Sequence, residues 1–149
     1  MADETGMRVL EAQLRSADSV AILRHGMNMC GLLFLWQVFS HCCPLMLLAG
    51  WSAALIVATA ASIGLSTHRG GANGPSDLRR HGLGALLQGL VWASCMALIG
   101  RSGQMTELIA LWTLVSCVMV CGAISYAATP LAASAYLLPC IVGLFFMFD

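Results

Sequence analysis

The chain has 149 residues, of which 59% are hydrophobic and only 9% are charged, and its formal net charge is zero. A soluble domain is typically about 25% charged, so this composition indicates an integral membrane protein and leaves almost nothing for an aqueous domain. With seven Arg, no Lys and no net positive charge, the sequence gives no argument for a nucleic-acid partner.

The first 25 residues predict a short amphipathic helix ahead of the membrane region. Within residues 7–24, apolar residues recur three and four apart and form one weak stripe. Glu11 and Arg15 are spaced for an ion pair on such a helix. The segment lacks the layout of a cleavable signal peptide. We expect residues 1–25 to be a cytoplasmic juxtamembrane helix that lies on the membrane or pairs with another helix.

Long runs without charge predict the membrane spans. Neither Gly26–His68 nor Leu108–Phe148 contains an Asp, Glu, Lys or Arg, and His81–Gly100 is a shorter run of the same kind. A helix rises about 1.5 Å per residue and must cross a hydrocarbon core of about 30 Å. The fold class is therefore an all-α polytopic helical bundle with about five transmembrane helices. The expected spans are 26–41, 44–65, 82–100, 105–124 and 130–148.

The connections between these spans contain turn-forming residues. Pro44 is a favourable first residue for the second span, and Pro130, preceded by Thr129, for the fifth. Residues 67–75 are rich in Gly, Asn and Pro and predict a loop. Residues 101–104 form a tight connection before the fourth span.

The distribution of arginine predicts the orientation. Six of the seven Arg lie before the first span or in the connection between the second and third spans, and only Arg101 lies on the opposite side. The positive-inside rule then places the N-terminus in the cytoplasm. With five spans, Asp149 lies outside.

Small residues spaced by four predict close helix contacts. The second span carries such a stripe, and so does the third. These stripes are Gly50, Ala54, Ala58 and Ser62, and then Ala85, Gly89, Ala93 and Ala97. Because a short loop joins the two spans, we expect the stripes to pack against each other, with a homodimer interface as the alternative.

Pro139 lies inside the fifth span. It cannot donate a backbone hydrogen bond, and its ring crowds the carbonyl of Ala135. We expect a kink there, which can serve as a hinge.

Few residues are candidates for catalysis or for binding a metal or cofactor. His41, Cys42 and Cys43 are adjacent in the first turn and are the candidates for a metal or redox site. Glu107 is expected as a solvated carboxylate at a helix start. No catalytic motif occurs, so we expect no catalytic residue, no enzymatic activity and no cofactor. A haem-binding or redox module using His25, His68 and His81 is the weaker alternative.

The order of these features resembles the N-terminal membrane region of bacterial diguanylate cyclases and related sensor histidine kinases. The resemblance covers about residues 8–148. It is carried mainly by Gly84 and Trp92 in the third span and by Pro139 in the fifth. It implies a membrane-embedded sensory or anchoring input domain in the bacterial inner membrane. A sixth span and a cytoplasmic output domain, such as a GGDEF domain, would follow beyond this chain. The alternative is a standalone small membrane protein that acts as a transporter subunit or interaction partner.

Overall fold

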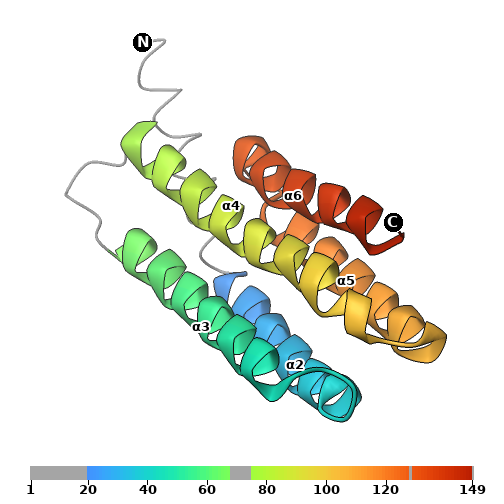
Figure 1. The fold of residues 1–149 in the computed structure, drawn as a ribbon. Helices are drawn as coiled ribbons and strands as arrows, with labels where there is room; N and C mark the ends of the chain where they lie inside the picture. Colours follow the sequence, from blue (N-terminus) through green and yellow to red (C-terminus); the bar gives the residue numbers. More distant parts are fainter. Residues whose placement is uncertain (1–19, 68–74, 128, 149) are drawn as a thin grey trace, which may run out of the picture.

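The computed structural model describes residues 20–67, 75–127 and 129–148, and within them every regular element is a helix. The all-α fold class is thereby confirmed. The elements are α2 (Ala21–Phe39), α3 (Leu45–Thr67), α4 (Pro75–Leu98), the short 3-10 helix η1 (Gly100–Ser102), α5 (Met105–Ser125) and α6 (Pro130–Phe148). Figure 1 shows these α-helices lying side by side as a bundle.

The observed bounds match the predicted spans most closely in the second half of the chain. Helix α5 begins at Met105 and α6 begins at Pro130, as expected. Helix α4 begins at Pro75, well before the expected start at residue 82. Helix α2 begins at Ala21, so residues 21–25 belong to the first bundle helix and not to a separate juxtamembrane helix. The rest of the predicted amphipathic helix lies outside the described residues.

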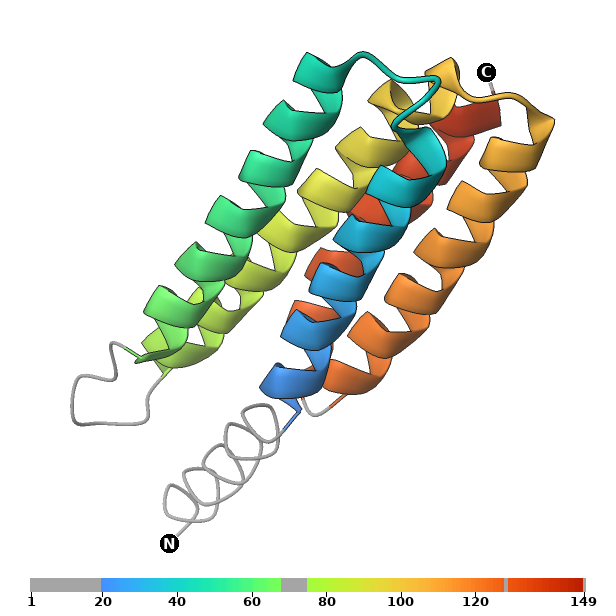
Figure 2. The same ribbon diagram turned by 90° about the horizontal axis from the view of Figure 1, so that it is seen from below.

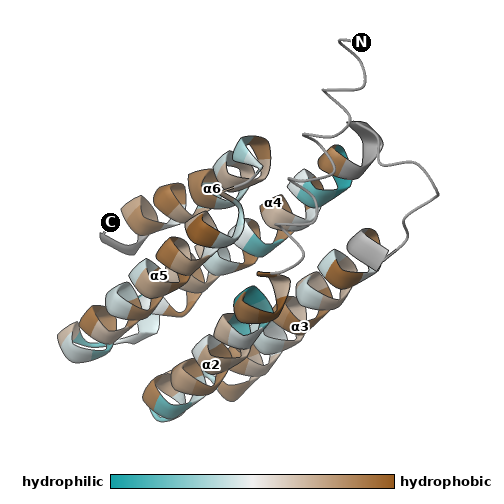
Figure 3. Ribbon diagram, turned by 180° about the vertical axis from the view of Figure 1, so that it is seen from behind, coloured by the Kyte–Doolittle hydropathy of each residue, from teal (hydrophilic) through white to brown (hydrophobic). Residues whose placement is uncertain are grey.

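Three of the described helical segments are long and apolar enough to cross a membrane: Leu45–Leu65, Leu78–Ser102 and Met105–Ser125. A shorter apolar helix covers Pro130–Phe146. Large apolar side chains are exposed on every helix of the bundle, which is the arrangement expected of a lipid-facing surface. Figure 3 shows hydrophobic residues along most of each helix, with the hydrophilic ones gathered mainly toward the helix ends.

The helices form a closed ring. Helix α2 contacts α3, α3 contacts α4, α4 contacts α6, α6 contacts α5, and α5 returns to α2. Figure 1 shows α4 between α3 and α6, and Figure 2 shows the start of α2 and the C-terminal end at opposite ends of the bundle. Consecutive helices are antiparallel, so α4 and α6 run parallel although α5 separates them in sequence.

At Gly89 and Ala93 the small-residue stripe of α4 packs against α6. A side chain built at Gly89 would collide with the backbone carbonyl of Tyr136. A side chain at Gly143 would come within 2.7 Å of the Cα of Ala93. For these residues the expectation that the stripe meets the second span was therefore wrong in its partner. Small residues allow two helix backbones to approach closely but do not specify which helix approaches.

The stripe of α3 is divided between two faces. Gly50 and Ala54 are exposed, and nothing lies within 4 Å of a Cβ built at Gly50. Ala58 and Ser62 are buried, and a Cβ built at Gly84 of α4 would lie 3.2 Å from the hydroxyl of Ser62. Only the second half of the stripe therefore lies in the helix contact, and the homodimer stays a prediction.

Two tryptophans form hydrogen bonds between neighbouring helices. The indole of Trp36 in α2 donates to the hydroxyl of Ser52 in α3 at 2.9 Å. The indole of Trp51 in α3 donates to the carbonyl of Val91 in α4 at 2.8 Å. Trp51 is buried in the core, so its ring also packs the contact between α3 and α4.

Helix α6 continues through Pro139 as one helix from Pro130 to Phe148. One turn before Pro139, Tyr136 lies against Gly89, and directly after it the thiol of Cys140 donates to the carbonyl of Gly89 at 3.7 Å. The contact with α4 therefore holds α6 on both sides of the proline. The kink and hinge stay predictions.

Replacing Gly89 by Leu is expected to lower the thermal midpoint in detergent more than replacing Leu87 by Ala. The new side chain must displace the Tyr136 backbone, and such overpacking typically costs about 1–3 kcal/mol or more. Gly50→Leu is the matched control, because Gly50 faces open space. Equal midpoints for Gly89→Leu and Gly50→Leu would show that α4 and α6 do not pack as described.

Candidate functional site in the bundle core

A cluster of polar side chains is buried in the bundle near the end where α2 begins. It consists of Arg24 and Asn28 of α2, Gln88 and Trp92 of α4, Ser125 at the end of α5 and Tyr126 directly after it. We call this set the Arg24 cluster. Each of the six side chains is at least 94% buried, since the most exposed of them, Arg24, keeps 6% of its surface.

Two pairs with the same spacing build the cluster. Arg24 and Asn28 are four residues apart on α2, and Gln88 and Trp92 are four residues apart on α4, so each pair lies on one helix face. Trp92 donates its indole N–H to the side-chain oxygen of Asn28 at 3.2 Å. The hydroxyl of Tyr126 bonds the side-chain oxygen of Gln88 at 3.4 Å. The cluster therefore connects α2, α4 and the turn after α5.

The guanidinium of Arg24 stacks on Tyr126. Its Cζ atom lies 4.7 Å from the centroid of the phenol ring. A cation held over an aromatic face gains about 0.5–2 kcal/mol, depending on how far it is desolvated. This contact stabilises the buried charge, but a ring face does not accept all the hydrogens that a guanidinium donates.

Several buried atoms of the cluster have no hydrogen-bond partner. They are Nε and Nη1 of Arg24, Nδ2 of Asn28, Nε2 of Gln88 and Oγ of Ser125. The Asn28 assignment follows from chemistry, because an indole N–H only donates and so must face the amide oxygen, which leaves the amide NH₂ free. Every free atom except the Ser125 hydroxyl is thus a pure N–H donor. Unsatisfied polar groups inside an apolar bundle are costly, which makes this cluster the candidate functional site.

Tyr136 of α6 completes the surroundings of the cluster. Its ring lies 5.7 Å from the ring of Tyr126, and its hydroxyl donates to the carbonyl of Val118 in α5 at 3.2 Å. A side chain at Gly122 would overlap the Tyr136 ring, so that glycine provides the space for it. Helix α3 also reaches the region, because the ring of Trp51 lies edge-on to the ring of Trp92 with centroids 5.3 Å apart, so each of the helices α2 to α6 borders the cluster.

The predicted candidate His41 lies at the opposite end of the bundle. Its Nε2 is 3.4 Å from Oε1 of Glu107. Glu107 also closes the start of α5, because its Oε2 accepts the backbone N–H of Gln104 at 3.0 Å in a capping box. Glu107 is therefore a helix-start carboxylate, as expected, and the His41 contact is an exposed pair of small energetic weight.

Cys42 and Cys43 do not join His41 in a common site. Cys43 is buried in the apolar core, whereas the Cys42 thiol donates to the carbonyl of Phe39 at 3.7 Å. Partial burial raises the pKa of the Cys42 thiol, and the Glu107 carboxylate adds to the rise. A thiol that stays protonated is a poor ligand and nucleophile. Among the side chains that the structure places, no three His, Cys, Asp or Glu residues gather as metal ligands.

Of the histidines considered for haem, His25 lies in the first turns of α2 and His81 in the first half of α4, and His68 is outside the described residues. The haem alternative stays a prediction.

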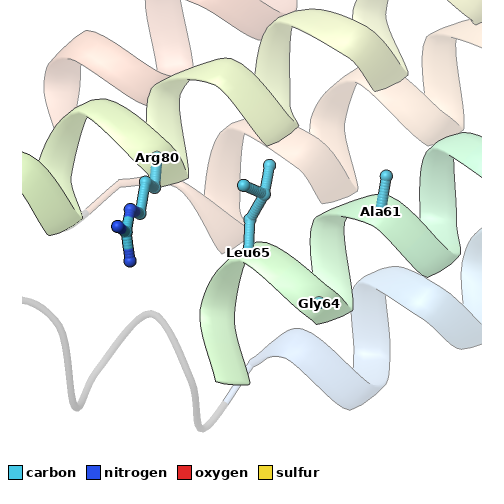
Figure 4. Close-up of a pocket in the computed structure, with 4 residues that line it drawn as sticks. All are labelled: Ala61, Gly64, Leu65 and Arg80. Carbon is cyan, nitrogen blue, oxygen red and sulfur yellow. The ribbon is translucent and has the colours of Figure 1, made fainter. Parts of the chain in front are cut away.

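An open groove runs between α3 and α4. Figure 4 shows Ala61, Gly64 and Leu65 of α3 and Arg80 of α4 around it, and its volume is about 490 Å³. The lining is apolar apart from Arg80. It is therefore a surface suited to contact with lipid and not an enclosed binding pocket.

The sequence contained an unused signal for the Arg24 cluster. Asn28 and Gln88 stand out as polar residues within charge-free runs, and each has a second polar or aromatic partner four residues away. Arg24 was assigned to the segment before the first span, which hid its pairing with Asn28. The role of Tyr126 depends on how α5 is placed and has no signal in spacing.

Comparison with known proteins adds no assignment. No family model, curated protein or solved structure matches the chain.

The bond between Trp92 and Asn28 predicts non-additive effects of substitution. Asn28→Leu leaves the indole N–H unpaired and Trp92→Phe leaves the amide oxygen unpaired, each costing about 1–3 kcal/mol for the orphaned group. The double variant removes both groups, so its loss of stability is expected to be smaller than the sum by about 1 kcal/mol. Unfolding in detergent for all four forms measures this coupling, and strict additivity would contradict the bond.

Proposed function

We propose that the chain is a membrane-embedded sensory input domain of a bacterial signalling protein. In this proposal the bundle crosses the inner membrane five times, and a cytoplasmic output domain of the cyclase or kinase type follows a sixth span. The resemblance carried by Gly84, Trp92 and Pro139 supports this assignment, as do the three helices that are long and apolar enough to span a membrane. On this proposal the chain itself is not an enzyme.

The observation that carries the sensory role is the incomplete bonding of the Arg24 cluster. An anchor needs only apolar helices, and a buried arginine inside it is a net cost. In this bundle the unpaired donors lie on α2 and α4, and Tyr126 links them to the α5–α6 turn. A ligand that completed these bonds would favour one relative position of the helices over another, which is the property that a sensor requires.

A standalone small membrane protein is the second candidate. The specific observation in its favour is the exposed half of the α3 stripe, Gly50 and Ala54, which leaves a smooth helix face free for a partner helix. In that case the chain would act through contact with another membrane protein.

The proposed topology predicts the location of the chain ends. A reporter fused after Asp149 is expected to read periplasmic, and one fused before Met1 cytoplasmic, because the arginine-rich segments share the N-terminal side. Paired alkaline phosphatase and fluorescent-protein fusions measure this. A cytoplasmic reading after Asp149 would exclude either the odd number of spans or the orientation.

The sensory role predicts that the output depends on the cluster. The chain extended by a sixth span and a GGDEF domain is expected to form a membrane-bound cyclase whose product level changes with Arg24→Gln. The matched control is Arg101→Gln, which removes an exposed arginine at the other end. If the same output followed when an unrelated six-span anchor replaced the chain under every growth condition, only an anchoring role would remain.

A further inference from the structure

We infer that the Arg24 cluster binds an anionic oxygen group, a carboxylate or a phosphate, carried by a small molecule or by a lipid headgroup. The inference rests on the proposed function, because the bound anion would be the input that the domain senses. It also goes beyond it, because binding is a property of the chain alone.

The chemistry of the free atoms selects the ligand. Nε and Nη1 of Arg24 and the amide nitrogens of Asn28 and Gln88 are donors without acceptors. A carboxylate or phosphate carries only acceptors, and its bonds to charged or amide donors are the short, strong kind. A cation or a second donor would leave the same hydrogens unpaired.

The charge balance of the region points to the same class of ligand. Arg24 is 94% buried, and its neighbours in the cluster are neutral. Two acidic residues lie within the described helices: Asp77 in the first turn of α4, and Glu107, which contacts His41 at the other end of the bundle. Water could accept hydrogen bonds from Arg24 but would not neutralise it, whereas an anion does both.

Arg24 lies close to the end of the bundle, in the first turns of α2, and keeps 6% of its surface exposed. Its Nε and Nη1 atoms are buried, so an anion that bonds them must enter through a movement of the side chains around this end. His25 Nδ1 and Thr59 Oγ1 also lack partners, but no bond observed in the described residues joins them to the cluster.

The test uses the whole chain purified in an uncharged sugar detergent, with thermal unfolding as the readout. At constant ionic strength, sodium phosphate or sodium acetate is exchanged for sodium chloride. In a separate arm, short-chain phosphatidic acid is compared with short-chain phosphatidylcholine. A ligand at about ten times its dissociation constant is expected to raise the thermal midpoint by about 3–6 °C. A response to the free anions identifies a small-molecule source, and a response to phosphatidic acid alone identifies a lipid headgroup.

Two variants assign the response to the cluster. Arg24→Gln is expected to lose the shift, whereas Arg101→Gln keeps it. Asn28→Asp supplies a carboxylate four residues from Arg24. Asn28→Asp is therefore expected to raise the thermal midpoint without ligand and to abolish the response to added anion. Its control is Gln37→Glu, at an exposed position farther along α2, which is expected to do neither. Asn28→Asp keeps the test decisive if Arg24→Gln does not fold.

The inference is overturned if no anion or phospholipid shifts the parent chain, or if Asn28→Asp is less stable than the parent. The cyclase fusion separates this from the proposed function. If the cyclase output depends on Arg24 but no anion binds, the sensory role is supported and the anion ligand is excluded. If an anion binds but the cyclase output does not change when the whole region is replaced, the anion site is supported and the sensory role is excluded.

Discussion

The bundle depends on a shortage of hydrogen-bond partners in its interior. Lipid tails are as apolar as the core, so apolar contact alone does little to hold one helix at a fixed rotation against the next. The indole N–H of Trp92 must find an acceptor, and Asn28 of α2 provides it at 3.2 Å. Trp51 of α3 packs its ring edge against Trp92, with centroids 5.3 Å apart, and bonds the neighbouring carbonyl of Val91. Trp92 therefore fixes three helices at one level of the bundle.

The second determinant is the close approach of α4 and α6. Two helices separated by α5 in sequence pack in parallel because Gly89 and Gly143 remove the side chains that would keep the backbones apart. Tyr136 then reaches past Gly122 to the carbonyl of Val118, which ties α5 to the same contact. The polar bond of Trp92 and the contacts of Gly89 and Ala93 with α6 lie on adjoining faces of α4, so α4 packs against α2, α3 and α6 at this level.

The sequence predicts where the helices lie better than it predicts which helices pack together. Absence of charge located the helices, and the turn residues Pro44 and Pro130 placed two of the starts closely. The small-residue stripes did not predict which helix packs against them. A step of four residues turns about 400° around the helix, so each successive member of a stripe lies about 40° farther around the helix. From Gly50 to Ser62 the drift is about 120°, enough to carry the stripe from an exposed face to a buried one. Pairing of α4 with α6 depends on the closure of the whole ring, which no local pattern contains.

Arg24 shows where two physical roles of one residue conflict. Counted as a positive charge it supports the orientation, yet the described structure places it inside the bundle over Tyr126. The orientation argument does not depend on it, because five of the other six arginines still lie on the same side and Arg101 on the other. Because the orientation does not need Arg24 and burying its charge is costly, we expect the residue to have a functional role. The unpaired donors around it indicate that this role is binding, since only a ligand that carries both negative charge and hydrogen-bond acceptors would satisfy the cluster.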